Sequence, residues 1–264
     1  MKKKYSIVSA IVFCFCLLLV VSGCVIHIGD WPRANYEKTI KVQAPLESGS
    51  FLAADTSYGS ITVNGANTTD CSVLATIRVQ APSEQEAAEI AEQVKIELEQ
   101  TGKTLTVRAD KPHLKSKRSI GISYEITVPM QTNLECANSY GSIECMNING
   151  QVHADTSYGD IKCRNIISGE LKTSSSYGSV YIEYSDLAPA EIQADVSTSY
   201  GGIYFTAPPG FTGQVQLSTS YGSVKTDLPI TVQGKISKTR IKGTIGEGNG
   251  KLILKTSYGS IGLR

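Results

Sequence analysis

Seven copies of the tripeptide Ser-Tyr-Gly are the residues whose type and spacing point most directly to chemistry in this chain. A tyrosine ring can stack against a sugar ring or another aromatic ring, and its hydroxyl group both donates and accepts hydrogen bonds. A surface that repeats such rings could bind a glycan or an envelope polymer. The seven tyrosines, here called the tyrosine ladder, are Tyr58, Tyr140, Tyr158, Tyr177, Tyr200, Tyr221 and Tyr258.

Other residue types that support catalysis or metal binding are present without a matching pattern. Asp155 and Asp160 flank one Ser-Tyr-Gly copy, but neighbouring copies hold Ala or Ser there, so a glycosidase pair of carboxylates is not indicated. His27, His113 and His153 lack the mutual spacing and the cysteine neighbours of a metal site. We therefore expect a protein that is not an enzyme and that has no catalytic residues, cofactor or metal.

The spacing of the copies predicts a repeat architecture. From Tyr140 to Tyr221 the tyrosines are 18, 19, 23 and 21 residues apart. Self-similarity at about 20 residues is typical of folds in which each repeat stacks on the one before it. Stacked strands would place equivalent tyrosine rings about 4.8 Å apart.

The residues around each tyrosine predict two strands joined by a bend. In the copy centred on Tyr158, Val152 and Ala154 before it and Ile161 and Cys163 after it are apolar and alternate with mostly polar residues. This period of two is typical of strands with one buried face. The inward-facing positions are an even number of residues before the tyrosine and an odd number after it, and this change occurs once, at the glycine. It indicates a bend that requires an unusual backbone conformation.

We predict an all-β fold, a single-stranded β-solenoid similar to a parallel β-helix, with coils of about 18–23 residues. Residues 131–264 form its repeats, roughly six coils. The 37 residues between Tyr221 and Tyr258 are expected to add one further coil that lost its motif. The apolar residues of that coil would be Ile230, Val232, Ile236 and Ile241.

Residues 46–130 are predicted to cap the repeats. They contain the first Ser-Tyr-Gly copy, a helix over 83–100 and flanking strands. Ser83 and Glu86 have capping-box spacing, and Ala87, Ile90 and Ala91 fall on one face of the helix. Because an open end of a repeat stack exposes its core and its strand edges, we interpret this helix as the cap.

The first residues predict export and lipid anchoring. Lys2 to Lys4 precede an apolar run that ends at Val21, and Ser22-Gly23-Cys24 follows. Residues 1–23 therefore have the features of a secretory signal peptide. Residues 24–45 would form the anchor, a linker and the first strand. The small residues before Cys24 resemble a bacterial lipobox, which implies cleavage before Cys24 and its modification with diacylglycerol and a further acyl chain such as palmitate; the alternative is an ordinary signal peptide.

Charge and cysteine content limit the partners. The formal net charge is +1, so no strong field favours nucleic acid. When the cysteines of the signal segment and Cys24 are set aside, four cysteines remain: Cys71, Cys136, Cys145 and Cys163. Cys145 and Cys163 share one inward column in adjacent repeats, a poor geometry for a disulfide. Buried free thiols are expected, with one disulfide or metal ligation as alternatives.

Several features together resemble one bacterial family. They are the lipobox, Trp31, the helix that begins at Ser83, the Thr-Ser-X-Gly-Ser/Asp-Ile repeats and the closing 243–248 segment. This chain resembles the β-strand-repeat domain of unknown function known as putative adhesin, over nearly all of its length after residue 23. The resemblance implies a β-solenoid exposed at the cell envelope, on the outer membrane in a diderm bacterium. The family often has a small polar residue before the glycine, where this chain has tyrosine.

Two function classes follow for the tyrosine ladder. In the first, the protein is a lipid-anchored adhesin or surface-binding module whose rings bind a glycan or envelope polymer. In the second, it is a structural or envelope-sensing lipoprotein without a ligand, and the rings stiffen the bend and fix the register. Exposed rings would favour binding and buried rings would favour structure. A flat Thr/Ser array that orders water, as in ice-binding proteins, is a third use, but the Thr column is expected to face inward.

Overall fold

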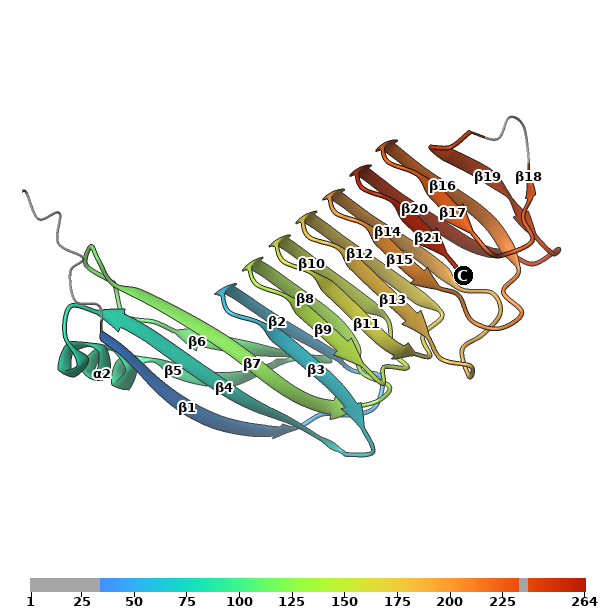
Figure 1. The fold of residues 1–264 in the computed structure, drawn as a ribbon. Coiled ribbons are helices and arrows are strands. Elements are labelled where there is room, and N and C mark those ends of the chain that lie inside the picture. Colours follow the sequence, from blue (N-terminus) through green and yellow to red (C-terminus); the bar gives the residue numbers. More distant parts are fainter. Residues whose placement is uncertain (1–33, 233–236) are drawn as a thin grey trace, which may run out of the picture. The chain divides into compact units, whose positions relative to one another are not determined.

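The computed structural model describes residues 34–232 and 237–264, which form two mixed β-sheets and one α-helix (Figure 1). Sheet A contains, in spatial order, β1 (Ala34–Pro45), β4 (Asp70–Ala81), β7 (Ser119–Pro129), β3 (Ile61–Ala66), β9 (Ile143–Met146), β11 (Ile161–Ile166), β13 (Val180–Tyr184), β15 (Ile203–Thr206), β21 (Ile261–Leu263) and β17 (Val224–Thr226). Sheet B contains β18 (Thr231–Val232), β19 (Arg240–Ile245), β16 (Gly213–Tyr221), β20 (Gly250–Tyr258), β14 (Gln193–Tyr200), β12 (Glu170–Tyr177), β10 (Val152–Tyr158), β8 (Asn133–Tyr140), β2 (Phe51–Tyr58), β6 (Thr104–Asp110) and β5 (Lys95–Thr101).

Each Ser-Tyr-Gly repeat contributes one strand to each sheet (Figure 1). The strand before the tyrosine joins sheet B, and the strand after the glycine joins sheet A. Strands of neighbouring repeats pair in parallel and in register, so that Val152 lies opposite Leu134 and Ile161 lies opposite Ile143. These residues are buried in one hydrophobic core between the sheets. The predicted alternation and the all-β class are therefore confirmed.

The glycine of each repeat allows the chain to pass from one sheet to the other. Gly141, which follows β8, has a φ of +144°, a conformation that residues with a side chain rarely adopt. A Cβ atom at Gly141 would also lie 1.8 Å from the carbonyl oxygen of Gly59 in the adjacent repeat. The predicted bend is confirmed, and both its backbone angle and the close approach of stacked bends require glycine.

In six of the seven repeats, the residue two positions before the tyrosine supports the neighbouring bend from inside. The Thr156 hydroxyl donates a hydrogen bond of 3.0 Å to the carbonyl oxygen of Gly141. The Thr198 hydroxyl donates in the same way to Gly178, at 2.8 Å. Both threonines are buried. The column faces inward, as expected, so its hydroxyl groups satisfy backbone carbonyls of the bend and do not form a surface array.

The helix is shorter than predicted. Helix α2 covers Glu84–Gln93, and Ser83 caps it by accepting a hydrogen bond from the Glu86 backbone N–H. The prediction of a helix over 83–100 is wrong in its second half, because β5 begins at Lys95. Ile96 and Leu98 alternate with polar residues and face the core or its margin. Ile96 and Leu98 are two positions apart, which fits one face of a strand. Leu98 also lies four positions after Val94, which fits one face of a helix, so the segment satisfies both patterns.

Strands, not the helix, cover the edges of the first repeat. β6 pairs in parallel with β2 of sheet B, and β7 pairs in parallel with β3 of sheet A. Helix α2 packs its buried face against β1 and β4 instead. The interpretation of the helix as the cap of the strand edges is therefore wrong, although its Ala87, Ile90 and Ala91 side chains do cover part of the core. A sheet edge exposes a row of N–H and C=O groups, and another strand satisfies them more completely than a helix can.

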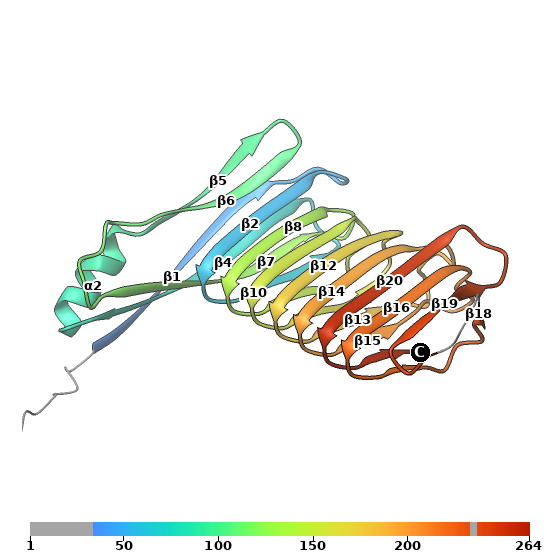
Figure 2. The same cartoon turned by 90° about the horizontal axis from the view of Figure 1, so that it is seen from above.

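The last repeat does not lie at the end of the row. β20 is inserted between β14 and β16 and pairs in parallel with both (Figure 2). The expected further coil between Tyr221 and Tyr258 is absent from the described residues, since β19 pairs antiparallel with β16 and with β18. Val232 and Ile241 belong to this antiparallel edge, and Ile230 directly precedes β18. Ile236 lies outside the described residues.

Candidate functional site

The tyrosine ladder is continuous. Neighbouring ring centroids are 4.7–4.9 Å apart, and the ring planes are 1–7° from parallel. The separation is the spacing of the strands that carry the rings, as the repeat predicted. In spatial order the ladder is Tyr58, Tyr140, Tyr158, Tyr177, Tyr200, Tyr258 and Tyr221.

The bend holds each tyrosine in place through its backbone. The Gly141 N–H donates to the Tyr158 carbonyl oxygen at 2.7 Å, and the Gly159 N–H donates to that of Tyr177 at 2.8 Å. Each tyrosine lies opposite its equivalent in the next strand, as Tyr158 does opposite Tyr140. The rings therefore start from the same backbone geometry in every repeat, which allows identical side-chain conformations and parallel stacking.

The ladder is half-exposed. The seven side chains have relative exposures between 45% and 66%. Because the planes are parallel and neighbouring rings face one another, the faces of the inner rings are covered. The exposed part of each inner ring is therefore its edge, which carries the phenolic hydroxyl group. The ladder thus presents a ridge of apolar edges and hydroxyl groups, next to the serine that precedes each tyrosine.

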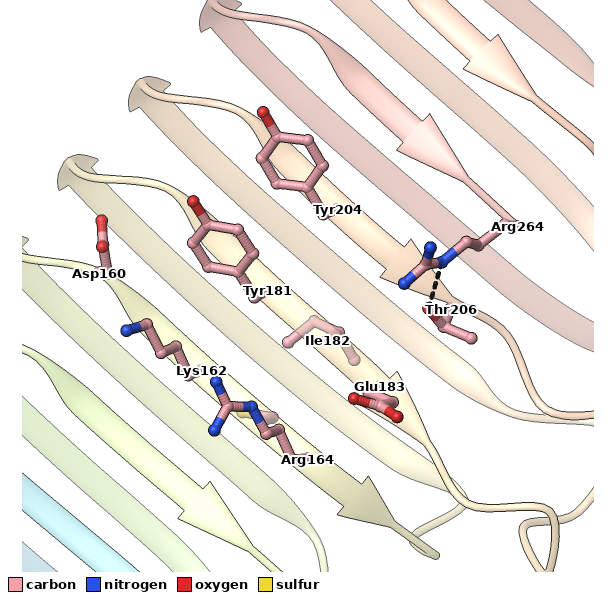
Figure 3. Close-up of a pocket in the computed structure, with 10 residues that line it drawn as sticks. Asp160, Lys162, Arg164, Tyr181, Ile182, Glu183, Tyr204, Thr206 and Arg264 are labelled. Atoms are coloured by element: carbon pink, nitrogen blue, oxygen red, sulfur yellow. Dashed lines mark hydrogen bonds between the residues drawn. The ribbon is translucent and has the colours of Figure 1, made fainter.

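A second pair of stacked tyrosines was missed by the sequence analysis. Tyr181 and Tyr204 lie on β13 and β15, on the outer face of sheet A, with ring centroids 5.0 Å apart and planes at 10°. Figure 3 shows the two rings side by side, with Asp160, Lys162 and Arg164 beyond Tyr181. Both tyrosines stand four positions after a ladder tyrosine. The sequence carried that signal, but the prediction followed only the columns that face inward.

The region around this pair is a shallow cleft with a mixed polar margin (Figure 3). Its volume is about 400 Å³. The Arg264 guanidinium donates a hydrogen bond of 3.1 Å to the Thr206 hydroxyl. Glu183 supplies a carboxylate to the same lining, and Arg164 forms an ion pair of 3.0 Å with Glu144. The margin therefore offers hydrogen-bond donors and acceptors close to exposed aromatic rings.

The four described cysteines are free thiols and are buried. Cys145 lies opposite Cys163 on adjacent parallel strands, as predicted. A hydrogen bond with Cys145 and burial both raise the pKa of the Cys136 thiol. Burial raises the pKa of Cys71 to about 12. The Cys71 and Cys136 thiols are thus neutral at physiological pH, and all four buried cysteines pack as small apolar side chains.

The acidic and histidine residues considered in the sequence lie apart from the tyrosine pair or only at its margin. On sheet B, the half-exposed side chains of His153 and Asp155 form a pair, with 2.8 Å between His153 Nε2 and Asp155 Oδ2. Asp160 follows the bend and accepts a hydrogen bond of 2.8 Å from the Ser179 backbone N–H. Across residues 34–232 and 237–264, no three His, Cys, Asp or Glu side chains are arranged to hold a metal ion.

The predicted anchor lies outside the described residues, as do Cys24, the signal segment, His27 and Trp31. Among the helices of the described part, none has the length and apolar character needed to span a membrane.

Comparison with known proteins gives structural neighbours at low identity. No protein-family model and no curated protein matches the chain. A solved structure described as a putative cell adhesion protein from Clostridium sporogenes has 14% identity and a TM-score of 0.42, over 86% of this chain and 99% of that one. A putative adhesin from Bacteroides fragilis has 12% identity and a TM-score of 0.33, over 86% and 97%. A putative lipid binding protein from Parabacteroides distasonis has 11% identity and a TM-score of 0.30, over 86% and 96%.

Proposed function

We propose that this chain is a non-catalytic, adhesin-type binding module of the bacterial cell envelope, and that the tyrosine ladder is its contact surface. The observation that carries the proposal is the exposure of the ladder: seven stacked rings lie in one row, each between 45% and 66% exposed. If the rings served only to stabilise the fold, we would expect other parts of the chain to cover them. Exposed aromatic rows on soluble domains commonly serve binding.

The repeat of the ladder suits a polymer. The rings recur every 4.7–4.9 Å, and each offers an apolar edge and a hydroxyl group. A polysaccharide or another hydroxyl-rich envelope polymer also repeats apolar and hydrogen-bonding groups along its length. Many weak contacts on one rigid row act together, so the whole row binds more tightly than any single ring.

The row would be rigid because the repeats form a β-solenoid, which is the finer description we propose for the paired sheets. Parallel pairing in register, one strand per repeat in each sheet and a glycine bend in every repeat support it. In this arrangement each repeat contacts mainly its neighbours, and the repeats present a long continuous surface.

Lipid anchoring at Cys24 would place this surface at the cell envelope, in the outer membrane if the organism is diderm. The proposal rests on the signal segment and on Ser22-Gly23-Cys24. Two or three acyl chains give stable membrane attachment, whereas one chain gives only marginal attachment. The Cys24→Ser variant of the full-length protein should lose lipid labelling and be released or stalled. An unmodified Cys24 at the mature N-terminus, found by mass spectrometry, would exclude the anchor.

Binding by the ladder can be tested with two matched variants. Replacing Tyr158, Tyr177 and Tyr200 with Phe removes three hydroxyl groups and leaves the stack, whereas replacing them with Ser removes the rings. Full-length protein would be applied to arrays of glycans and cell-wall polymers. Retained polymer should fall with the Phe variant and be lost with the Ser variant. Leu187→Ser, which changes an apolar side chain that is 78% exposed and outside the ladder, is the control.

The second candidate is a structural or envelope-sensing lipoprotein without a ligand of its own. The covered faces of the inner rings favour it, because offset stacking contributes roughly 0.5–1.5 kcal/mol per pair. Under this alternative the Ser variant loses stability, and no polymer on the array distinguishes it from the wild type. Polymer binding that depends on the three rings would exclude it.

A further inference from the structure

One row of outward side chains on sheet A is interrupted by a glycine. Parallel pairing places Tyr181, Tyr204, Gly262 and Lys225 next to one another on β13, β15, β21 and β17. Three of these residues have long side chains, and Gly262 has none. An open slot therefore lies over β21, between Tyr204 and Lys225, and its width is two strand spacings, roughly 9.5 Å.

The slot leaves one face of an aromatic ring uncovered. One face of Tyr204 stacks on Tyr181, at a centroid distance of 5.0 Å. The other face borders Gly262, where even an added Cβ atom would come no closer than 3.8 Å to the Tyr204 Cδ1 atom. The Tyr204 side chain is 51% exposed. The ring leans along its strand over Gly202, where an added Cβ atom would lie 3.0 Å from the Tyr204 Cε2 atom. Stacking on Tyr181 fixes this orientation, so the free face is preorganised for a flat ligand.

The margin of the slot supplies both donors and acceptors of hydrogen bonds. Lys225, Asp227 and Arg264 line the slot together with Tyr204, and its volume is about 410 Å³. The guanidinium of Arg264 is oriented by its hydrogen bond to Thr206, as Figure 3 shows. Two cationic donors and one carboxylate acceptor lie around one aromatic face. A ligand of a single strong charge would be repelled by part of this margin.

We propose that this slot binds one neutral pyranose ring of a glycan, stacked on Tyr204 in the place of the missing side chain. A pyranose has an apolar C–H face for the aromatic ring and hydroxyl groups that both donate and accept hydrogen bonds. Stacked rings are separated by 4.5–7 Å between centroids, which is the room that one absent side chain leaves in this row. The proposal does not require the tyrosine ladder to bind anything.

Filling the slot tests the proposal without removing any contact. Gly262→Thr places a side chain over β21, and the local geometry accepts a Cβ atom there. Threonine also favours a strand more than glycine does, so the melting temperature should be unchanged or higher. The probes are the methyl glycosides of glucose, galactose, mannose and N-acetylglucosamine, and saturation-transfer NMR on the full-length protein measures their binding.

We expect at least one glycoside to bind the wild type and to bind Gly262→Thr roughly tenfold more weakly or worse. Tyr204→Leu, which removes the aromatic face, should lose binding to the same extent. Thr62→Ser changes a residue farther along the same row, where Thr62 lies opposite Glu144, and should bind like the wild type. Wild-type affinity in Gly262→Thr, or no saturation transfer from any of the four glycosides, overturns the proposal.

Two further outcomes separate this site from others. Binding that survives in Gly262→Thr but is lost in Tyr204→Leu would place the ligand elsewhere on Tyr204 and exclude the slot. The Phe variant of Tyr158, Tyr177 and Tyr200 should retain glycoside binding. If that variant loses it, the sugar binds the ladder, and the slot proposal fails while the proposed function stands. If Gly262→Thr does not fold, Lys225→Met decides, and its unchanged affinity would contradict the proposal.

Discussion

The ring of Tyr258 stacks on that of Tyr200 at a centroid distance of 4.9 Å, although Tyr221 comes between them in the sequence. The other face of Tyr258 stacks on Tyr221, at 4.7 Å. The last repeat of the chain is therefore an inner rung of the ladder, and the repeat before it is the outer one. β20 follows the same order, since it pairs with β14 on one side and β16 on the other.

This order predicts different costs for two otherwise equivalent tyrosines. Tyr258→Ser removes two ring contacts, whereas Tyr221→Ser removes the one that the described rings give it. Tyr258 is also less exposed, at 46% against 66%. We expect Tyr258→Ser to lower the free energy of unfolding by about 0.5–1.5 kcal/mol more than Tyr221→Ser does, measured by urea denaturation. Equal costs would show that ring stacking adds nothing to stability.

The centre of the ladder should contribute to stability. Replacing Tyr158, Tyr177 and Tyr200 with Ser removes four stacking contacts, and we expect a loss on the order of 2–6 kcal/mol and a lower melting temperature. The Phe variant keeps the rings and should melt close to the wild type. Polymer binding lost at an unchanged melting temperature would instead make the ladder a binding surface alone. If neither property changes, the repeated tyrosines have neither role.

The bend glycines should tolerate no side chain. In Gly141→Ala the new Cβ atom would lie 1.8 Å from the Gly59 carbonyl oxygen, and φ is +144°. We expect a loss of about 3 kcal/mol or more, or failure to fold. Gly210→Ala is the matched control, because Gly210 also has a positive φ, of +70°, but no heavy atom within 4 Å of the added Cβ. Its expected cost is about 1–2 kcal/mol. Circular dichroism during thermal unfolding compares the two.

The free energy of unfolding should fall in alkaline solution, because buried thiol and phenol groups are stable in the folded protein only in their neutral form. Burial raises the pKa of Cys71 to about 12 from an ordinary value of 9.0. Burial likewise raises the pKa of Tyr124 to about 12 from 10.0. A folded-state pKa above the unfolded-state value favours folding at low pH, and this contribution is lost as pH rises from about 9 towards 12. Each such group lowers the free energy of unfolding by up to about 1.4 kcal/mol per pH unit in this range.

Urea midpoints measured from about pH 7.5 to about pH 10.5 test this expectation. The midpoint should be level below about pH 9 and fall above it. Cys71→Ala is expected to be less stable at neutral pH because it leaves a small cavity, yet its midpoint should fall less steeply with pH. An equal slope in the two proteins would mean that Cys71 does not titrate during unfolding.

Much of the local structure was predictable because each repeat carries the same local information. The alternation around Tyr158 identified both strands and their buried faces, and the glycine after it identified the bend. Equivalent residues in successive repeats then implied the register, so the spacing of the ladder and the alignment of Cys145 with Cys163 followed without coordinates. The helix end was missed, because Val94, Ile96 and Leu98 satisfy helical and strand periodicity in a short window.

The sequence by itself therefore determined the strands, the bend and the in-register columns, since side-chain alternation and backbone angles are properties of a few consecutive residues. Only the tertiary structure decided which repeats are neighbours. Identical repeats offer nearly identical edges, so local sequence does not choose among them. In the structure β20 lies between β14 and β16, and the antiparallel strand β19 covers the outer edge of β16. This order of repeats also creates the row of Tyr181, Tyr204, Gly262 and Lys225. Gly262 belongs to the last repeat, and it lies next to Tyr204 because that repeat is inserted beside β15.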